Sequence, residues 1–236
     1  MPETINVGDY VVTIMPRLGG GTFGQVYKAV HRKTKEDVAI KQIHLTHDDV
    51  DAHDSKLHDM AQAEIDAMRS LQDHPNIVKL FRCISKDDSV FLVMEFCDLR
   101  DVSSYLKKNK DISALSKIRI MKQAASAFAF MHSQEKPIVH RDIKLENILL
   151  KTENGEPVVK IADFGLAMLC DEEKWGSKSF ANKTFMSSVV GTKYFQVCIF
   201  LLLILTPVNI YIDYTYIYDL IIFKTIYVIR TKRYFV

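Results

Sequence analysis

The most diagnostic residues of this chain are Ile138-Val139-His140-Arg141-Asp142-Ile143-Lys144-Leu145-Glu146-Asn147-Ile148-Leu149. An aspartate follows His-Arg, and an asparagine comes after four intervening residues. The Asp142 carboxylate can accept the proton of a substrate hydroxyl, and the Asn147 amide can offer its oxygen to magnesium. Downstream, the strand-like pair Ile161-Ala162 leads into Asp163-Phe164-Gly165, whose carboxylate can bridge magnesium to phosphate groups. Together these residues indicate phosphoryl-transfer chemistry.

A glycine-rich segment lies far upstream, at Leu18-Gly19-Gly20-Gly21-Thr22-Phe23-Gly24-Gln25-Val26. It satisfies the pattern GxGxxGxV, and the missing side chains let backbone amides approach phosphate oxygens. A glycine-rich hairpin without a ligand would have the same sequence, so the segment alone is weak evidence. The strand candidate Val38-Ala39-Ile40-Lys41 then ends in a lysine that can reach phosphates. Glu64, which could also be an ordinary exposed helix residue, can pair with Lys41.

With these five features in this order, the chain resembles eukaryotic-type serine/threonine protein kinases from about Tyr10 to Gln196. The resemblance implies an α+β, bilobal fold with a β-rich N-lobe, one key helix and an incomplete helical C-lobe. Residues 10–96 would form the N-lobe. Residues 97–196 would form a partial C-lobe that contains the hinge, catalytic loop and activation segment, and residues 197–236 are an apolar tail outside the family pattern.

The resemblance also implies the site residues. Catalytic roles go to Asp142, Lys144, Lys41 and Glu64, and the magnesium ligands would be Asn147 and Asp163. The nucleotide would contact Gly19, Gly20, Gly21, Gly24, Val26, Ala39, Lys41, Met94 as gatekeeper, Glu95 and Cys97 through their backbones, Asp101 and Leu149. A hydrophobic spine would consist of Met68, Leu80, His140 and Phe164, although simple core packing explains the same apolar positions.

Substrate class and regulation follow from the same resemblance. The chain resembles serine/threonine kinases in having a lysine, Lys144, two residues after Asp142. The substrate hydroxyl is therefore expected on serine or threonine. With Arg141 directly before Asp142, the chain also resembles kinases whose activation segment is ordered by phosphorylation, because an arginine at this position can pair with a phosphate. The candidate phosphorylation sites are Ser177, Ser179, Thr184, Ser187 and Ser188. Two departures, Asp98-Leu99-Arg100-Asp101 at the hinge and Leu145 in place of a common proline, obscure the subfamily.

Composition excludes some partners and sites but does not indicate a reaction. A formal net charge of +2 argues against nucleic acid or an anionic membrane as the main partner. The four cysteines are Cys83, Cys97, Cys170 and Cys198; they form no CxxC pair, so neither a disulfide framework nor a zinc site is expected. No basic stretch followed by an apolar one occurs at Met1, so no secretory signal is expected and a cytoplasmic location is predicted.

The hydrophobic pattern predicts the element order. Strands are expected at 11–14, 26–30, 38–43, 77–83 and 90–96, and a helix at 60–71. Helices are also expected at 102–108 and 118–132. A ligand crevice is expected near residues 95–100, where the sequence changes from strand-rich to helix-rich. The stretch His44–His58 is rich in histidine and aspartate, but no HxxxH pair with a third ligand is evident. A solvated loop is therefore expected there rather than a metal site.

The family pattern breaks after Gly191-Thr192-Lys193-Tyr194-Phe195-Gln196, where Ala-Pro-Glu should follow and Val197-Cys198-Ile199-Phe200-Leu201 stands instead. Residues 197–236 contain no Gly, Ala, Ser, Glu or Trp. Because Val-Cys-Ile can be encoded by a sequence that starts like an intron donor, the tail is interpreted as translated intron. One rival interpretation is a membrane anchor, but the apolar run is too short to span a bilayer and Pro207 interrupts its extension. The other is an authentic β-rich extension of the chain.

Two functions are compatible with these residues. The first is ATP-dependent phosphorylation of protein serine and threonine hydroxyls, with ATP and Mg²⁺ as cofactors and a protein as substrate. The second is a nucleotide-binding but catalytically inactive truncated kinase, because the nucleotide and metal residues are present while much of the expected C-lobe is missing. Restoring a continuation that begins Ala-Pro-Glu after Gln196 is expected to give a soluble kinase.

Overall fold

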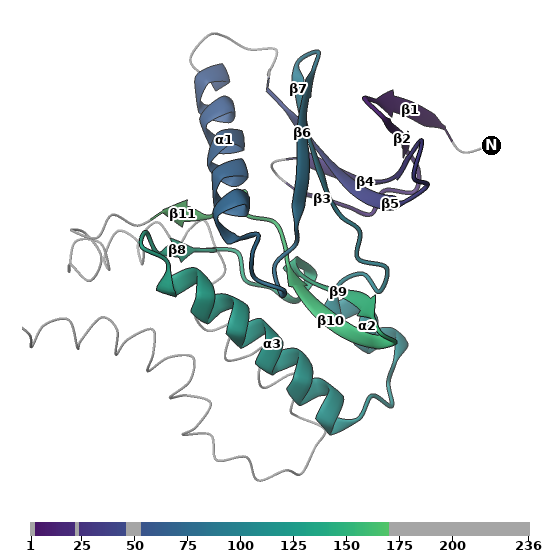
Figure 1. The fold of residues 1–236 in the computed structure, drawn as a ribbon, viewed down its shortest axis with the longest axis vertical. Coiled ribbons are helices and arrows are strands. Elements are labelled where there is room, and N and C mark those ends of the chain that lie inside the picture. Colours follow the sequence, from purple (N-terminus) through teal and green to yellow (C-terminus); the bar gives the residue numbers. More distant parts are fainter. Residues whose placement is uncertain (1–2, 22–23, 46–52, 170–236) are drawn as a thin grey trace, which may run out of the picture. The chain divides into compact units, whose positions relative to one another are not determined.

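The computed structural model describes residues 3–21, 24–45 and 53–169, and the chain divides into two compact units (Figure 1). The first unit comprises residues up to Asp73 together with Val78–Asp98. The second contains His74–Ile77 and the chain from Leu99 onward. The candidate phosphorylation sites at 177–188 and the tail at 197–236 lie outside the described residues.

The first unit is built on an antiparallel sheet. Its strands are β1 (Thr4–Val7), β2 (Tyr10–Thr13), β3 (Gly19–Gly21), β4 (Gly24–His31), β5 (Asp37–His44), β6 (Leu80–Lys86) and β7 (Ser89–Glu95). They are ordered β1-β2-β4-β5-β7-β6, and β3 pairs with β4. The predicted antiparallel run of strands before the first helix is confirmed by β2, β4 and β5, while β1 had no counterpart in the prediction.

The sheet curls so that its first and last strands approach each other. Lys86 Nζ on β6 donates to the carbonyl oxygen of Asn6 on β1 at 3.2 Å, and Arg82 lies 3.8 Å from the Asp9 carboxylate. The curled sheet encloses an apolar core, which burial of nonpolar surface stabilises. That core consists of Val7, Tyr10, Val12, Tyr27, Ala29, Val38, Ile40, Phe91 and Val93.

Helix α1 (His53–Leu71) belongs to the same unit. Its buried residues recur at helical spacing, as expected for an amphipathic helix; they are Ala61, Glu64, Ile65, Ala67, Met68 and Leu71. The predicted start at Met60 and the predicted loop up to His58 are wrong, because the helix begins at His53. No glycine or proline stands within residues 53–59, so the sequence there contains no helix-breaking residue.

The strand predicted at 77–83 begins only at Leu80, as β6. Ile77 instead forms an isolated parallel bridge with Ile161, and its N–H donates to the His74 carbonyl at 3.2 Å. Residues 74–77 are thus a hydrogen-bonded loop of the second unit. Strand β7, buried at every position from Ser89 to Glu95, matches the apolar run predicted at 90–96.

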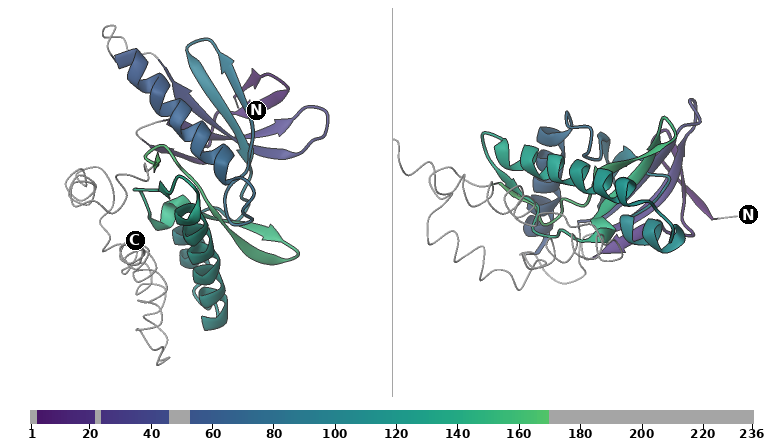
Figure 2. Two further views of the ribbon diagram at one scale, coloured as in Figure 1. Left: turned by 60° about the vertical axis from the view of Figure 1, so that its left-hand side comes forward. Right: turned by 90° about the horizontal axis from the view of Figure 1, so that it is seen from below.

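The second unit contains helices and short strands. They are α2 (Val102–Lys108), α3 (Ala114–Ser133), β8 (Ile138–Val139), the 3₁₀ turn η1 (Leu145–Asn147), β9 (Ile148–Glu153), β10 (Glu156–Ile161) and β11 (Met168–Leu169). Helix α3 packs against β10 (Figure 2), and Ser113 caps it by accepting the Ser116 N–H at 3.1 Å. This cap explains why α3 starts before the predicted residue 118. A sheet-rich unit and a helix-containing unit confirm the α+β class.

Strands β9 and β10 form a hairpin, and β10 ends two residues before Asp163. Its two turn residues, Asn154 and Gly155, have φ angles of 51° and 80°, the combination that a type I′ turn requires. The register pairs Ile148 with Ile161, so the end of the catalytic-loop motif lies beside the start of the Asp-Phe-Gly motif.

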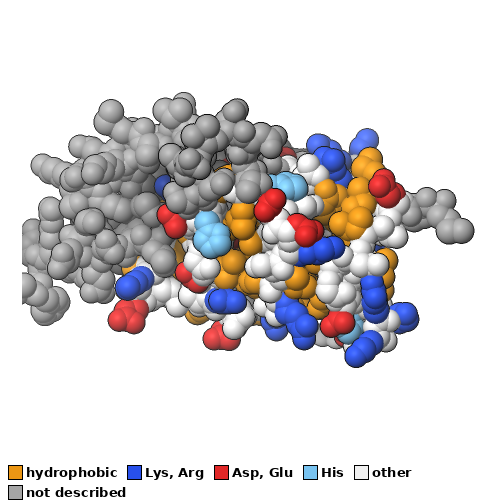
Figure 3. Space-filling view, turned by 90° about the horizontal axis from the view of Figure 1, so that it is seen from above, with side chains coloured by type: hydrophobic (Ala, Val, Ile, Leu, Met, Phe, Trp, Pro, Cys, Tyr) orange, Lys and Arg blue, Asp and Glu red, His pale blue; other side chains and the backbone are white. Residues whose placement is uncertain are grey.

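One face of the described residues is mixed in charge. On the face drawn in Figure 3, Lys and Arg side chains are interspersed with Asp and Glu side chains rather than gathered by sign. Within residues 3–21, 24–45 and 53–169, none of the helices combines the length and the apolar character needed to cross a bilayer.

Candidate active site

Lys41 on β5 and Glu64 on α1 form a buried ion pair in the first unit. Lys41 Nζ lies 2.7 Å from Glu64 Oε1 and 2.9 Å from Oε2. The two residues are only 5% and 2% exposed. The pairing predicted from sequence is confirmed, and the alternative of an exposed helix glutamate is wrong. A bidentate, buried contact fixes the position of the ammonium group, which is what a phosphate-binding lysine needs.

The glycines of the first unit differ in what requires them. Gly24 has a φ of +152°, and a Cβ built on it would lie 2.3 Å from the Gln42 carbonyl oxygen. A Cβ on Gly19 would meet nothing within 4 Å, and one on Gly20 would lie 3.8 Å from the Gly24 carbonyl oxygen. The chain's own packing therefore requires Gly24, whereas Gly19 and Gly20 leave open space where a ligand could contact the backbone.

This difference predicts opposite outcomes for two alanine substitutions. Gly24→Ala is expected to destabilise the protein by about 3 kcal/mol, because the new methyl overlaps backbone atoms. Gly20→Ala is expected to change the free energy of unfolding by less than about 0.5 kcal/mol, as at other open surface positions, but to weaken ATP binding. Urea unfolding and ATP titration of both variants measure the two effects. Equal losses of stability would contradict the distinction.

The remaining candidate nucleotide contacts of the first unit lie on its strands or directly after one of them. Val26 is half-buried on β4, and the other four are buried: Ala39 on β5, Met94 and Glu95 on β7, and Cys97 just after it. The Glu95 N–H donates to the Lys79 carbonyl at 3.0 Å. Of the Glu95 backbone groups, the carbonyl oxygen is therefore the one that could accept a hydrogen bond from an adenine. Leu149, predicted to contact the same ring, lies on β9 in the second unit.

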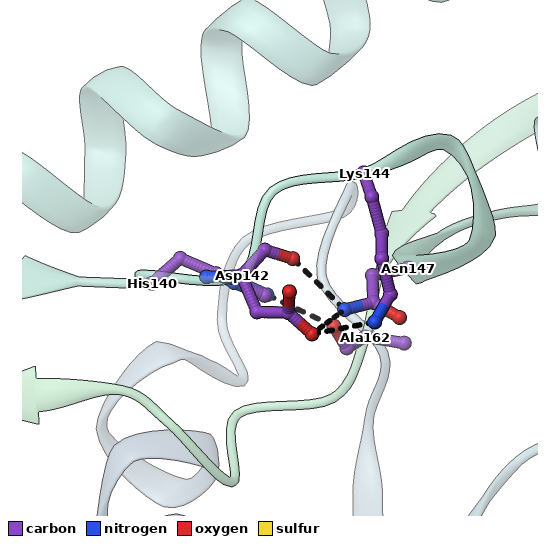
Figure 4. Close-up of polar contacts among 5 residues, drawn as sticks. All are labelled: His140, Asp142, Lys144, Asn147 and Ala162. Atoms are coloured by element: carbon purple, nitrogen blue, oxygen red, sulfur yellow. Dashed lines mark hydrogen bonds and ion pairs between the residues drawn. The ribbon is translucent and has the colours of Figure 1, made fainter. Parts of the chain in front are cut away.

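The catalytic-loop motif of the second unit places two donors on one carboxylate oxygen (Figure 4). Lys144 Nζ lies 2.7 Å from Asp142 Oδ2, and Asn147 Nδ2 lies 2.9 Å from the same oxygen. Asn147 Nδ2 also donates to the Asp142 backbone carbonyl at 2.8 Å. These bonds hold the Asp142 carboxylate in one orientation.

The same contacts fix the orientation of the Asn147 amide. A backbone carbonyl can only accept a hydrogen bond, so the amide atom 2.8 Å from the Asp142 carbonyl must be nitrogen. The amide oxygen of Asn147 is then the atom that can serve as a metal ligand. Together with the Asp163 carboxylate it provides the hard oxygen donors that Mg²⁺ prefers, so these two residues fit the predicted ion.

Asp163 is reached through a short segment that the catalytic loop holds in place. The Ala162 N–H donates to the Asn147 carbonyl at 3.0 Å, and His140 Nε2 lies 2.9 Å from the Ala162 carbonyl oxygen. Asp163 itself has a φ of 63°, the left-handed region that costs a non-glycine residue free energy. Sequence reasoning missed the role of Ala162, because its contacts are all made by its backbone.

His140 links the loop to this segment as a neutral ring. The Asp142 N–H donates to His140 Nδ1 at 3.3 Å, so Nδ1 is the acceptor and Nε2 carries the proton that goes to Ala162. Burial lowers the pKa of His140 below its ordinary value of 6.5, while the bond to Ala162 and the charges of Asp163 and Asp142 act in the opposite direction. The ring also lies 5.2 Å from that of Phe164, centroid to centroid.

The lowered pKa predicts an acid-labile fold. Below pH 6.5 His140 becomes protonated in the unfolded chain while it stays neutral in the folded chain. The free energy of unfolding therefore decreases as the pH falls below 6.5. The loss for one such group reaches about 1.4 kcal/mol for each pH unit between the two pKa values. Urea unfolding at pH 7.5, 6.5 and 5.5 measures it, and a stability that is flat over this range would contradict the buried, neutral His140.

The four predicted spine residues are all buried: Met68 and Leu80 in the first unit, and His140 and Phe164 in the second. Arg141, predicted to pair with a phosphate, has a φ of 63°, and its Nε donates to the Leu166 carbonyl. The side chain is thereby tied to the residues that follow Asp163. Its predicted phosphate partners lie outside the described residues.

Asp101, a predicted nucleotide contact, caps helix α2. Its Oδ1 accepts the Ser104 N–H at 2.7 Å, and its Oδ2 accepts the Ser104 hydroxyl at 2.6 Å. The capping role was missed, although an aspartate before a helical stretch is a recognised signal for it.

Two substitutions separate the cap from the predicted ligand role. Asp101→Ala is expected to lower the free energy of unfolding by about 1 kcal/mol, whereas Asp101→Ser keeps a capping oxygen and most of the stability. If the carboxylate also contacts the nucleotide, both variants weaken ATP binding equally. Denaturant unfolding together with ATP titration measures both effects, and equal stability of the two variants would contradict the capping assignment.

Comparison with known proteins identifies a family model, described as protein kinase domain, that matches residues 12–197. The match ends one residue past Gln196, where the sequence departs from the pattern. Three similar proteins are a serine/threonine-protein kinase ATG1a from Arabidopsis thaliana, a serine/threonine-protein kinase atg1 from Dictyostelium discoideum and a calcium-dependent protein kinase 5 from Plasmodium falciparum.

The identities are 32% over 181 residues for the Arabidopsis protein, 35% over 168 for the Dictyostelium protein and 34% over 181 for the Plasmodium protein. The matched regions cover 77%, 70% and 76% of this chain, but only 27%, 24% and 28% of those proteins. The chain thus spans about a quarter of the length of these relatives. The resemblance and the bilobal α+β fold predicted from the motifs are confirmed at the level of the family.

Proposed function

Because this chain belongs to the protein kinase domain family, we propose that it transfers the terminal phosphoryl group of ATP to serine and threonine hydroxyls of a protein substrate. The observation that supports this most strongly is the Asp142 carboxylate, held by both Lys144 and Asn147. The serine/threonine kinases among its relatives support the substrate class.

Each site residue has a distinct part in the proposed reaction. Asp142 orients the substrate hydroxyl and accepts its proton as the oxygen attacks phosphorus. Lys144, 2.7 Å from Asp142, places a positive charge beside the carboxylate and the transferred phosphoryl group. Asn147 and Asp163 would hold Mg²⁺, which neutralises negative charge on the phosphates when it is bound. Catalysis of this kind consists mainly of positioning and electrostatic stabilisation.

The first unit would supply nucleotide contacts. Lys41, fixed by Glu64, attracts phosphate oxygens, and the backbone at Gly19 and Gly20 is open to them. We assign residues 10–96 to an N-lobe and residues 97–196 to a partial C-lobe, with the hinge residues Glu95 and Cys97 and the side chains of Val26, Ala39, Met94 and Leu149 at the adenine. A cytoplasmic location is part of the same proposal.

Product analysis tests the proposal. The full chain is incubated with ATP labelled at the terminal phosphate, Mg²⁺ and a generic basic protein, and the labelled amino acids of the substrate are separated. Label on serine and threonine is expected, and label on tyrosine alone would contradict the role assigned to Lys144. Stabilisation by Mg-ATP in a thermal-shift measurement without any transfer would instead support the second function, nucleotide binding by a catalytically inactive kinase. Neither binding nor transfer would overturn both.

A further inference from the structure

A loop remote from the catalytic residues is hydrogen-bonded to the strand that leads to Asp163. The Asn76 carbonyl accepts the Ile161 N–H at 2.8 Å, and Ile77 forms a parallel bridge with Ile161. The Asn76 side chain reaches further back along β10, where its Nδ2 donates to the Val159 carbonyl at 3.0 Å. The loop therefore holds the last residues of β10 as an additional short strand would.

Gln123 on α3 completes this arrangement. Its Oε1 accepts the Val159 N–H at 2.8 Å and Asn76 Nδ2 at 3.0 Å. Both backbone groups of Val159 are thus taken by amide side chains, one on α3 and one on the loop. Val159 and Ile161 are 0% and 1% exposed and Asn76 is 7% exposed, so water cannot readily replace these bonds.

The backbone of Val159 fixes the orientation of both amides. A backbone N–H can only donate, so the Gln123 atom facing it must be oxygen. A backbone carbonyl can only accept, so the Asn76 atom facing it must be nitrogen. Gln123 is therefore needed as an acceptor and Asn76 as a donor, and neither can exchange roles by turning its amide.

We propose that Asn76 and Gln123 are positioning residues for the metal-binding aspartate Asp163. Both side chains bond to the backbone of Val159, and the Asn76 carbonyl bonds to Ile161, two residues before Asp163. Ala162 lies between Ile161 and Asp163. Its backbone is held from the opposite side, by His140 at the carbonyl and by Asn147 at the N–H. The segment that carries Asp163 in its left-handed conformation is thus bound on both flanks. This inference rests on the proposed function, since Asp163 has its metal-binding role only there.

Two isosteric changes from amide to acid test the proposal, because they should act in opposite ways. Asn76→Asp replaces the donating nitrogen by oxygen and points a carboxylate at two acceptors. Gln123→Glu keeps an acceptor for both Val159 and Asn76. Gln72→Glu, at an exposed position after α1, controls for the added negative charge.

The first readout is the Mg²⁺ concentration that gives half of the ATP-dependent thermal shift of the full chain. Loss of a group that orients a metal ligand typically weakens metal binding by about 10- to 100-fold, so Asn76→Asp should raise this concentration at least about tenfold. Gln123→Glu and Gln72→Glu should keep it near the wild-type value. Equal values for all four proteins, or equal losses in both clamp variants, would overturn the proposal.

The second readout is hydrogen exchange at the backbone N–H groups of Ile161 and Ala162, which needs neither nucleotide nor activity. Exchange should be faster in Asn76→Asp and unchanged in Gln123→Glu. If the wild-type chain neither binds Mg-ATP nor transfers phosphate, the proposed function fails, and exchange alone then decides whether the clamp positions the segment. Unchanged exchange in Asn76→Asp would overturn the clamp regardless of activity.

Discussion

Lys41→Met is expected to lower the free energy of unfolding by about 3–5 kcal/mol, the range measured when one partner of a buried ion pair is removed. The reason is the environment of Glu64, which is 2% exposed and accepts two hydrogen bonds from Lys41. Without the ammonium group, its carboxylate stays buried without this cation. The same variant should also lose ATP binding, because Lys41 is the proposed phosphate contact.

A second ion pair of equal length provides the control. Lys28 lies 2.7 Å from Asp37, but these side chains are 41% and 43% exposed. Lys28→Met should therefore cost less than about 1 kcal/mol, since solvent screens the exposed pair. Urea unfolding of both variants gives the comparison. Similar losses for Lys28→Met and Lys41→Met would show that burial of the Lys41 pair does not govern its contribution.

The sequence predicted best those elements whose residues also determine their local structure. Helix α2 was predicted with the bounds that the structure has, Val102–Lys108, and the strand predicted at 38–43 lies within β5. The Lys41–Glu64 pair was predicted because both residues occur at family positions on elements with clear periodicity. In each case the hydrophobic pattern and the motif indicated the same element.

Short elements that depend on pairing with another segment were not predicted. Strand β1 has a single buried residue, Val7, so its period-two pattern is too weak to read; pairing with β2 stabilises it. The predicted strand at 77–83 includes Ile77 because Ile77 and Val78 are apolar, yet Ile77 belongs to the loop at 74–77, which is bonded to Ile161. Contacts of this kind depend on residues more than 80 positions away, which local propensity cannot encode.

The candidate site shows the same division. Motif spacing predicted that Asp142, Lys144 and Asn147 belong to one site, and their side chains are hydrogen-bonded to one another. The backbone bonds of Ala162, the tautomer of His140 and the clamp by Asn76 and Gln123 became visible only with coordinates. Backbone groups carry no sequence signature, and an isolated asparagine or glutamine has many alternative roles.

Transfer of phosphate by wild type and Asp142→Asn tests most directly whether Asp142 carries the proposed reaction. Asparagine has nearly the same shape but does not take up the proton of the substrate hydroxyl. Removal of a general base typically costs about 10²- to 10⁴-fold in rate, so the initial rate should fall by that factor at saturating Mg-ATP. ATP affinity should change little, because Asp142 is not a proposed nucleotide contact.

Asp111→Asn, which removes an exposed carboxylate in the same unit, serves as the matched control and should keep the wild-type rate. The rate is measured as labelled phosphate incorporated into serine and threonine of the same basic protein. The account predicts transfer by wild type and Asp111→Asn and its near-complete loss in Asp142→Asn. Equal incorporation by wild type and Asp142→Asn would contradict the assignment of Asp142 and the reaction proposed for this chain.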